Sequence, residues 1–414
     1  MKARTVKVYE YEKLKTLPDQ YGRYLDDTEL KALIKFNDEN DNKYFTVINQ
    51  GIRFSQYVGV IQVGNLTLEI LPKADRVNHY EESEADKWRG ALLSMLKVCN
   101  KLSADAVNEA NLKRRPMSML DLYFRMFLKE LELLLHQGLF KKYKKETNNI
   151  KAWKGRMHFS KNLQHNLIRK DRFYTTHEVY SYDHTINRIL LKTLNIITQV
   201  SSDIDIIHSA KNLASLFPEQ THQAITESTF KRLPHSRKLV PYRQALKISE
   251  IIILNFSPEI KSGGTKLLAL LFDMNKLWEE YLFRMLCRVE RESFQVSAQQ
   301  SQKFWNWKSI RPDIVIKLDK ITYIIDAKWK IIDRKHPADA DLKQMYVYNM
   351  YWEAEKSMLL YPKAQESGEE ESFGVFHKGR EGDNLCKLGF VKVLDENGKL
   401  DQHIGDKIIA KLTA

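Results

Sequence analysis

Alternating apolar residues near the start of the chain predict β-strands. Val60–Val63 and Leu66–Leu71 flank Gly64-Asn65, a dipeptide that favours a hairpin turn. Because side chains alternate along a strand with a period of two, three apolar residues of the second segment would share a buried face: Leu66, Leu68 and Ile70. Residues 1–95 are therefore predicted to form a β-rich N-terminal domain.

From about Trp88 the apolar period changes to that of a helix. Apolar residues then recur three or four positions apart, most clearly at Leu120, Phe124, Phe127, Leu131 and Leu134. The pattern over residues 181–256 is also mainly helical. A mainly helical middle region is therefore predicted over residues 96–255.

The remaining residues combine helix and strand patterns. Ser262-Gly263-Gly264 is predicted to be a turn or short linker, after which a 4-3-4-3-4 spacing predicts one long amphipathic helix through Leu267, Leu271, Met274, Trp278, Tyr281 and Met285. Later segments predict, in order, strands over 311–317 and 321–329, a helix over 341–353, an exposed acidic loop over 366–371 and a strand around 389–393. Residues 256–414 thus form a predicted α/β domain, and the whole chain a multidomain protein of the α+β or α/β class.

Composition narrows the class of protein without identifying it. The chain has 414 residues and 43% hydrophobic residues, which excludes a single small module and an intrinsically disordered chain. Its 66 basic and 53 acidic residues give a net charge of +13. That excess of positive charge favours a polyanionic partner.

The positive charge is concentrated between Gly138 and Arg172, which enclose eleven basic and two acidic residues. Aromatic side chains interleave with these charges, as in surfaces that follow a phosphate backbone. A solvated basic face is the equally weighted alternative. Nine of the basic residues are the predicted contacts with double-stranded DNA: Lys141, Lys142, Lys144, Lys145, Lys154, Arg156, Arg169, Lys170 and Arg172.

Several other kinds of site are excluded by the sequence. Cys99, Cys287 and Cys386 are too far apart for a CxxC metal site, and three thiols cannot supply the four ligands of an iron–sulfur cluster. None of the twelve histidines has a metal-binding spacing such as HExxH. The longest apolar run, Leu267–Phe272, is too short for a membrane span. We therefore expect a cytoplasmic protein that does not associate with a membrane.

Candidate catalytic chemistry lies on the two predicted strands at 311–317 and 321–329. A hairpin symmetric about Asp319-Lys320 would place Asp313 directly opposite Asp326, with Cβ atoms roughly 4.5–5.5 Å apart. Lys328, two residues beyond Asp326, would point to the same face. Two carboxylates that close repel each other unless a cation offsets them, so the three side chains predict a Mg²⁺ site suited to phosphodiester hydrolysis. The alternative is a surface salt bridge on a hairpin.

Two flanking pairs could complete this site. Glu279 and Glu280 lie on the preceding predicted helix, where either carboxylate could join the metal ligands; the alternative is a pair of solvated helix glutamates. Gln344 and Tyr348 are four residues apart on the following helix and would share a face that could approach the scissile strand.

These motifs resemble a known nuclease family. Pro312-Asp313 with Asp326-Ala327-Lys328 resembles the PD-(D/E)XK signature, and Gln344 with Tyr348 resembles the QxxxY extension of its RecB-like branch. The wider chain resembles McrC, the nuclease subunit of McrBC methylcytosine-dependent restriction systems. This wider resemblance is carried by Tyr57–Ile61, Ile70–Lys73, Gly155-Arg156, Asn187-Arg188 and Asp273–Glu279.

The resemblance implies a restriction endonuclease-like fold for residues 256–414 and roles for particular side chains. Asp313, Asp326 and Glu279 would be Mg²⁺ ligands, with Glu280 as the alternative helix carboxylate. Lys328 would be the catalytic lysine, with Gln344 and Tyr348 as auxiliary residues. Whether two copies of the nuclease domain form a homodimer during cleavage stays open.

The resemblance also implies a partner, a hexameric McrB-type AAA+ GTPase that recognises methylated DNA and translocates, with docking through the N-terminal domain. Consistent with this, the chain has no GxxxxGK[ST] phosphate-binding loop, since Leu400 follows Gly398-Lys399. GTP would therefore be used by the partner. Related subunits act in systems that read unmodified sites, so the DNA target stays open. The rival prediction is a non-catalytic DNA-binding adaptor that stimulates the GTPase.

Overall fold

The computed structural model describes residues 4–72, 81–102, 118–234, 236–257, 266–330, 337–363, 373–376 and 384–413. The chain forms two compact units, one from Met1–Leu122 with Ser257–Ala414 and one from Tyr123–Phe256. The predicted domain boundaries at residues 95 and 255 assign the N-terminal and C-terminal parts of the chain to separate domains. In the structure both parts belong to one compact unit. The predicted turn at Ser262-Gly263-Gly264 and the predicted loop at 366–371 lie outside the described residues.

Two small sheets form the N-terminal part of the first unit. One contains neighbouring strands in the order β1-β6-β5-β11, with β1 parallel to β6 and the other pairs antiparallel. The second is antiparallel throughout, with the order β2-β4-β3. The strands are β1 (Arg4–Tyr9), β2 (Lys13–Lys15), β3 (Phe45–Ile48), β4 (Gly51–Phe54), β5 (Tyr57–Val63), β6 (Leu66–Leu71) and β11 (Leu267–Asp273).

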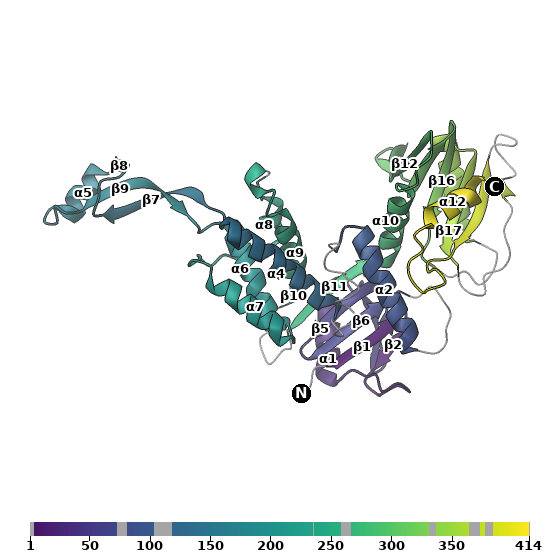
Figure 1. The fold of residues 1–414 in the computed structure, drawn as a ribbon, viewed down its shortest axis with the longest axis horizontal. Helices are drawn as coiled ribbons and strands as arrows, with labels where there is room; N and C mark the ends of the chain where they lie inside the picture. The colour runs from purple at the N-terminus through teal and green to yellow at the C-terminus, as the bar shows by residue number, and fades with distance from the viewer. Residues whose placement is uncertain are drawn as a thin grey trace. The chain divides into compact units, whose positions relative to one another are not determined.

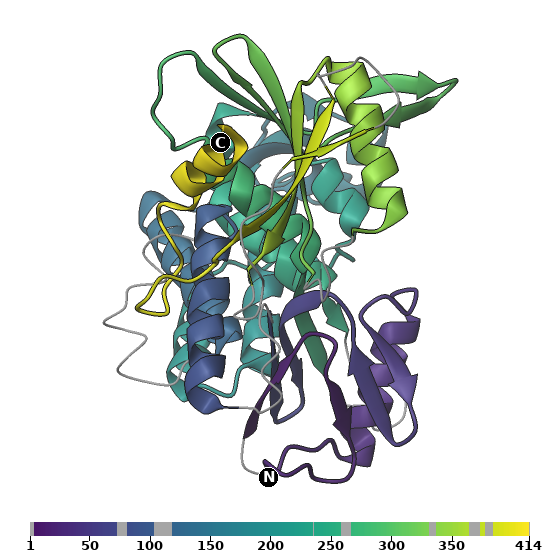
Figure 2. The same cartoon turned by 90° about the vertical axis from the view of Figure 1, so that its right-hand side faces the viewer.

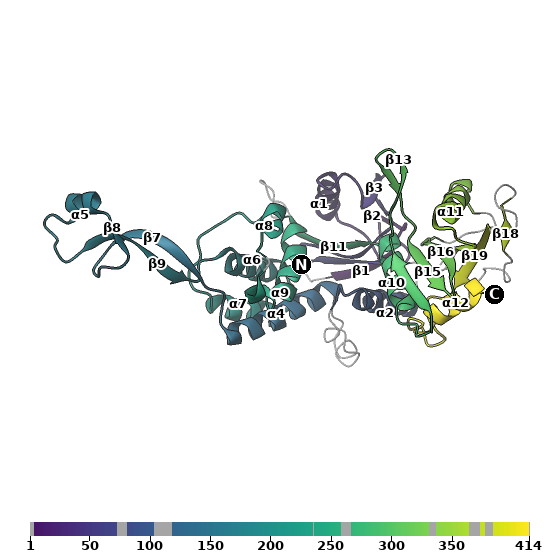
Figure 3. The ribbon, with the colours of Figure 1, turned by 90° about the horizontal axis from the view of Figure 1, so that it is seen from above.

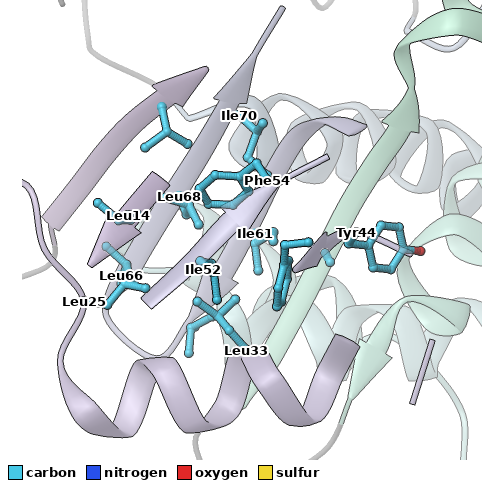
Figure 4. Packing of buried hydrophobic residues seen from close by; sticks show 14 of the residues in the cluster. Leu14, Leu25, Leu33, Tyr44, Ile52, Phe54, Ile61, Leu66, Leu68 and Ile70 are labelled. Carbon is cyan, nitrogen blue, oxygen red and sulfur yellow. The ribbon is translucent and has the colours of Figure 1, made fainter. Parts of the chain in front are cut away.

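The predicted hairpin is confirmed, because β5 and β6 pair from Val63 opposite Leu66 across the Gly64 turn. Its apolar face packs against helix α1 (Asp27–Asp38) and the second sheet, as Figure 4 shows. The core includes the three residues predicted to share the buried face, Leu66, Leu68 and Ile70. Gly59 has φ +138°, and a Cβ there would lie 2.0 Å from the Leu270 carbonyl oxygen. Only glycine therefore allows β11 to approach β5 at this point.

One element of the prediction is wrong: Leu267 and Leu271 do not belong to the long helix. The chain forms strand β11 up to Asp273, and helix α10 (Met274–Leu286) begins after it. Because the sheet buries both faces of its centre, β11 has a continuous apolar run that also fits a helical spacing. The Asp273 carboxylate accepts hydrogen bonds from the amides of Asn275 and Lys276 and so caps the new helix.

A six-stranded mixed sheet forms the C-terminal part of the same unit, in the order β12-β15-β16-β17-β19-β18. Strands β12, β15 and β16 are antiparallel neighbours, whereas β16, β17 and β19 run parallel. Helices α11 (Asp339–Trp352) and α12 (Ile404–Thr413) lie on opposite sides of it (Figure 2). The strands are β12 (Phe294–Ala298), β15 (Ile314–Leu318), β16 (Ile321–Ala327), β17 (Lys356–Pro362), β18 (Gly374–Val375) and β19 (Leu385–Val391).

The predicted elements of this part are largely confirmed. The two strand patterns become β15 and β16, the helix predicted over 341–353 becomes α11, and the last strand becomes β19. A separate hairpin pairs β13 (Gln302–Trp305) with β14 (Lys308–Ile310). Helix α2 (Glu82–Val98) completes the unit, and α4 (Met119–Gln137) starts in it.

The second unit has a helical part, as predicted for residues 181–256. Its elements are α6 (Thr185–Val200), α7 (Ile204–Ser215), α8 (Glu227–Lys231), the short 3₁₀ helix at Arg237–Leu239, α9 (Arg243–Leu254) and the start of β10 (Phe256–Ser257). The predicted helix through Leu120–Leu134 is confirmed as α4, which continues into this unit.

The basic segment differs from the mainly helical structure predicted for residues 96–255. It forms a ribbon of β7 (Lys142–Ile150), β8 (Arg156–Met157) and β9 (Phe173–Ser181) with the short helix α5 (Phe159–Asn166). This arm, residues 141–182, projects from the helices of its own unit (Figures 1 and 3). Most side chains of β7 are exposed, so its sequence lacks the apolar period that identifies buried strands.

Candidate active site

The β15–β16 hairpin has the predicted register. Ile314 pairs with Ile325 and Leu318 with Ile321, which leaves Asp319 and Lys320 as a two-residue loop. Both loop residues have positive φ, 48° and 71°, as a type I′ turn requires. Continued by one pair, this register places Asp313, just before β15, opposite Asp326 on β16.

The structure brings the predicted catalytic side chains together. The Lys328 ammonium lies 2.6 Å from Oδ2 of Asp326, whose side chain is 2% exposed. Oδ2 of Asp313 accepts a hydrogen bond of 2.8 Å from the amide of Ala327, next to Asp326. Both carboxylates and the ammonium therefore lie at the end of one strand pair, where β16 leaves the sheet.

Burial disfavours the charged forms of the acids in this cluster. It raises the pKa of Asp313, and the carboxylates of Asp326 and Glu279 raise it further. Burial also raises the pKa of Asp326, against the lowering effect of Lys328. Burial opposes ionisation of Lys328 too, but Asp326 and two further carboxylates outweigh it and raise the pKa of the ammonium. The cluster thus holds more negative charge than one lysine offsets.

The helix glutamates are distinguished by their partners. Glu280 forms ion pairs with Lys101, at 2.9 Å, and with Arg284, at 3.5 Å. The pKa of Glu279 is raised, first by burial and then by the nearby charge of Asp326. Helix α10 therefore presents Glu279 to the catalytic side chains, whereas Glu280 pairs with Lys101 and with Arg284 of the same helix.

The donor chemistry of the cluster suits a hard divalent cation. Magnesium binds proteins through one or two carboxylates and completes its shell with water and substrate phosphate. Asp313 and Asp326 supply two such carboxylates, and their disfavoured charge is what a cation would stabilise. Across the described residues, no three His, Cys, Asp or Glu side chains form a ready metal-binding group. Glu279 thus lies within electrostatic reach of the pair without closing a three-carboxylate set.

Gln344 and Tyr348 support the backbone that leads into Asp313. The Tyr348 hydroxyl donates a 2.9 Å hydrogen bond to the carbonyl of Arg311 and accepts one of 2.6 Å from Nε2 of Gln344. Tyr348 is buried in the core between α11 and the sheet. These two residues therefore share a face, as predicted, but the tyrosine hydroxyl is used to hold the chain two residues before Asp313.

Sequence reasoning missed Asp341 and Trp329. Asp341, in the first turn of α11, lies 3.8 Å from the Lys328 ammonium and 2.7 Å from that of Lys330. Trp329, next to Lys328, donates its indole N–H to Glu10 at 2.6 Å and packs edge-on against Trp278. The position of Trp329 directly after the Asp-x-Lys motif was a signal that could have identified it.

The nine predicted DNA contacts lie on the arm, and seven of them are exposed: Lys142, Lys144, Lys145, Lys154, Arg156, Arg169 and Lys170. Lys141 and Arg172 are partly buried. Large apolar side chains are exposed beside them, at Trp153, Phe159, Leu163, Leu167 and Ile168. The arm therefore offers both positive charge and apolar surface.

The base of the arm is held by one buried asparagine. Nδ2 of Asn187 donates to the carbonyls of Phe140 and Tyr182, at 2.8 and 2.7 Å, on the two sides of the ribbon. Its neighbour Arg188 forms an ion pair of 2.6 Å with Asp183. The Asn187-Arg188 pair noted in the sequence thus fixes where the arm leaves the helices.

Two further expectations can be compared with the structure. All three cysteines are free thiols. Within the described ranges, every helix is too short or too polar to cross a lipid bilayer.

Comparisons with known proteins agree with the resemblance seen in the sequence. A family model described as "McrBC 5-methylcytosine restriction system component" matches residues 52–362. A protein of Escherichia coli (strain K12), "Type IV methyl-directed restriction enzyme EcoKMcrBC", is 24% identical over 241 residues, which cover 54% of this chain and 68% of that protein.

Two solved structures from Thermococcus gammatolerans have a similar fold. The refined half-complex of McrB AAA+ hexamers with bound McrC contains a chain that matches with a TM-score of 0.74 and 18% identity, covering 99% of both chains. The McrBC complex determined by cryo-EM contains one with a TM-score of 0.53 and 19% identity, covering 69% of this chain and 88% of that one. The mixed α/β architecture with several sheets is therefore shared with these chains. Because the family model spans most of its length, this protein belongs to the family of McrBC 5-methylcytosine restriction system components.

Proposed function

We propose that this chain is the nuclease subunit of an McrBC-type restriction system and hydrolyses DNA phosphodiester bonds with Mg²⁺. The observation that carries the proposal is the meeting of Asp313, Asp326 and Lys328 at one end of the β15–β16 hairpin. An antiparallel β12-β15-β16 group that continues into parallel β17 and β19, with helices on both faces, supports a PD-(D/E)XK type of nuclease fold.

Each side chain has a role that follows from its position. Asp313 and Asp326 would hold the metal ion, which supplies a polarised phosphoryl oxygen and an acidified water when bound. Lys328 would stabilise negative charge that develops on the phosphate, because its ammonium is held next to the carboxylates and is 25% exposed. Glu279, on α10, would add negative charge beside Asp313 and Asp326. Gln344 and Tyr348 would position Asp313.

The proposal includes a motor partner. One solved structure of similar fold contains McrB AAA+ hexamers with bound McrC, and the other is an McrBC complex. The present sequence has no phosphate-binding loop of its own. We therefore propose assembly with a McrB-type GTPase that uses GTP and selects the DNA. Methylated DNA as the target, docking through residues 1–95 and pairing of two nuclease domains are parts of this proposal.

Cleavage by the reconstituted complex tests the proposal. With partner, GTP, Mg²⁺ and plasmid DNA, Asp326→Asn is expected to lower the rate of strand scission by roughly 10²-fold or more, since a metal ligand is removed. Asp319→Asn is the matched control, because it changes the same chemical group at the exposed tip of the same hairpin, where asparagine tolerates the positive φ. Size-exclusion chromatography checks that both variants still assemble.

Full cleavage by a pure Asp326→Asn complex would refute the nuclease assignment. Binding of DNA and stimulation of GTP hydrolysis without scission under Mg²⁺ or Mn²⁺ would instead favour the adaptor function. The exposed positive charge of the arm is the feature that would serve such an adaptor.

A further inference from the structure

A cavity of about 650 Å³ lies between the β13–β14 hairpin and helix α11. Its lining includes Phe304 and Ile310 from the hairpin, Lys343 and Val347 from the helix, and Arg311. Tyr348, which also lines it, donates its hydroxyl hydrogen to the Arg311 carbonyl, two residues before Asp313. The cavity therefore adjoins the segment that carries the proposed metal ligand.

The charge around the cavity favours an anion. Arg311 and Lys343 are both exposed and none of the lining residues is acidic. Neither side chain forms an ion pair with a carboxylate in the part of the chain that the structure describes. Residues 297–311 include three basic residues and no acidic one. A phosphate group that entered here would meet the positive charge of Arg311 and Lys343.

The hairpin also exposes large aromatic rings beside the cavity. Phe304, Trp305 and Trp307 are 47%, 57% and 81% exposed. Trp305 and Trp307 lie at the tip with ring centroids 5.8 Å apart. Such grouped apolar exposure marks binding surfaces, and aromatic side chains beside basic ones are the elements on which unpaired bases stack.

The cavity wall is held in place by contacts between the hairpin region and the end of α11. Nε2 of Gln302 donates to the carbonyl of Tyr351 at 3.0 Å, and the Trp352 indole N–H donates to Gln300 at 3.3 Å. The ring of Phe304 lies 5.7 Å from that of Tyr351. The cavity is thus formed before any ligand binds, which lowers the entropic cost of binding.

We propose that this cavity binds one unstacked nucleotide of the DNA strand beside the cleavage site, an inference that rests on the proposed nuclease function. Its base would stack on Phe304, its phosphate would contact Arg311 and Lys343, and the Trp305–Trp307 tip would separate it from its neighbour. The volume lies within the roughly 300–1,000 Å³ of small-molecule sites. Apolar side chains that unstack base steps are a known means of distorting DNA. The positive charge of Arg311 and Lys343 favours a nucleotide over an apolar protein segment.

Fluorescence anisotropy of the full chain tests this without cleavage, in EDTA. Two labelled duplexes of equal length are compared, one fully paired and one with a single bulged 2-aminopurine. We expect the wild-type chain to bind the bulged duplex at least about fivefold more tightly. Phe304→Ala and Lys343→Ala should each remove most of this preference. Lys317→Ala, an exposed lysine of β15 outside the cavity, is the charge control and should keep it.

Two further measurements decide among the outcomes. Binding by the wild type should change the fluorescence of the bulged 2-aminopurine, and Trp307→Ala should reduce this change. The Trp307 side chain is 81% exposed, so the substitution removes little packing. Thermal melting checks the fold of each variant. Equal binding of both duplexes by the wild type, or an unchanged preference in Phe304→Ala and Lys343→Ala, overturns the inference. The inference is also overturned if Phe304→Ala and Lys343→Ala lose binding of the McrB-type partner but keep wild-type DNA binding, since the cavity would then be a protein interface. A wild-type complex that never cleaves DNA refutes the nuclease function. The anisotropy measurement in EDTA does not depend on cleavage, so it still tests nucleotide binding by the cavity.

Discussion

The β15–β16 hairpin and the β7–β9 ribbon of the arm are both antiparallel strand pairs that carry charged side chains, but only the first lies inside a larger sheet. In the hairpin, neighbours on both sides bury Asp326 and most of Asp313, and a lysine offsets part of their charge. In the arm, most of the basic side chains face solvent.

The two regions differ in the free energy needed to remove each charge from water. A buried carboxylate has lost its hydration and must be held in one arrangement, so its partners are part of the protein. An exposed lysine keeps its hydration and costs little, so its partner need not be in the same chain. Charge in the hairpin therefore indicates a specific site, whereas charge in the arm indicates only a class of ligand.

The largest effect is expected from the lysine of the hairpin. Lys328→Ala removes the ammonium next to Asp326 and should lower the rate of cleavage by roughly 10²- to 10³-fold, as for other groups that stabilise developing charge. The variant should also respond more strongly to Mg²⁺, because the carboxylates are left without their offsetting charge. We expect millimolar Mg²⁺ to raise the thermal midpoint of Lys328→Ala by more than that of the wild type.

The control for this variant is Lys317→Ala, which removes an exposed lysine from the same hairpin. It should cleave DNA and melt like the wild type. If Mg²⁺ shifts the thermal midpoint of neither Lys328→Ala nor the wild type, Asp326 and Lys328 form a structural ion pair and not a metal site. The contrast between the hairpin and the arm would then be lost.

An intermediate effect is expected from neutralising the arm. Alanine is placed at four exposed basic positions: Lys142, Lys145, Arg169 and Lys170. DNA affinity at about 0.15 M salt should fall roughly tenfold, and the slope of log affinity against log salt should decrease by about 0.9 for each phosphate that the variant no longer neutralises. Filter binding or anisotropy at several salt concentrations measures both quantities.

A second quadruple variant removes the same charge from the helical part of that unit, at Arg232, Lys211, Arg237 and Lys238, which are also exposed. It should leave the slope unchanged. If both variants have the wild-type slope while the arm variant no longer binds the McrB-type partner, then the arm contacts protein.

The sequence predicted the hairpin well because its geometry follows from few rules. The period of two and a two-residue loop are sufficient to place Asp313 opposite Asp326, and the observed register agrees. The positive φ of Lys320 was the uncertain step, because a lysine stands where the favoured Asn-Gly and Asp-Gly turns have glycine. Tertiary burial of the sheet on both sides overrides that local preference.

Other features depend on contacts that no local pattern contains. Strand β11 has the apolar spacing of a helix, and only its pairing with β5, far earlier in the chain, decides its form. The choice between Glu279 and Glu280 was open because adjacent helix residues differ by only about 100° in direction. The ion pair from Lys101 to Glu280 distinguishes them in the structure. The strands of the arm were missed because exposed strands need no apolar alternation.

The smallest effect is expected at the base of the arm, where one carboxylate near the surface is nevertheless held by specific partners. Burial opposes ionisation of Asp183, but hydrogen bonds from Thr221 and Arg188 outweigh it and lower the pKa of its carboxyl to about 2. A depressed pKa stabilises the fold above the unfolded value of about 3.8, and that stabilisation is lost as the pH falls toward the folded value. The thermal midpoint of Asp183→Asn should therefore lie below that of the wild type by a constant amount between about pH 5 and pH 7, where the carboxyl is ionised in both states.

Below about pH 4 the two midpoints should converge, because the Asp183 carboxyl of the unfolded wild-type chain then binds a proton while that of the folded protein stays ionised down to about pH 2. Asp171→Asn, an exposed aspartate in the arm, is the control and should follow the wild type at every pH. A difference between Asp183→Asn and the wild type that stays constant down to about pH 2 would mean that the amide loses packing rather than charge. The base of the arm would then resemble the rest of the arm, where exposed charge contributes little to the stability of the fold.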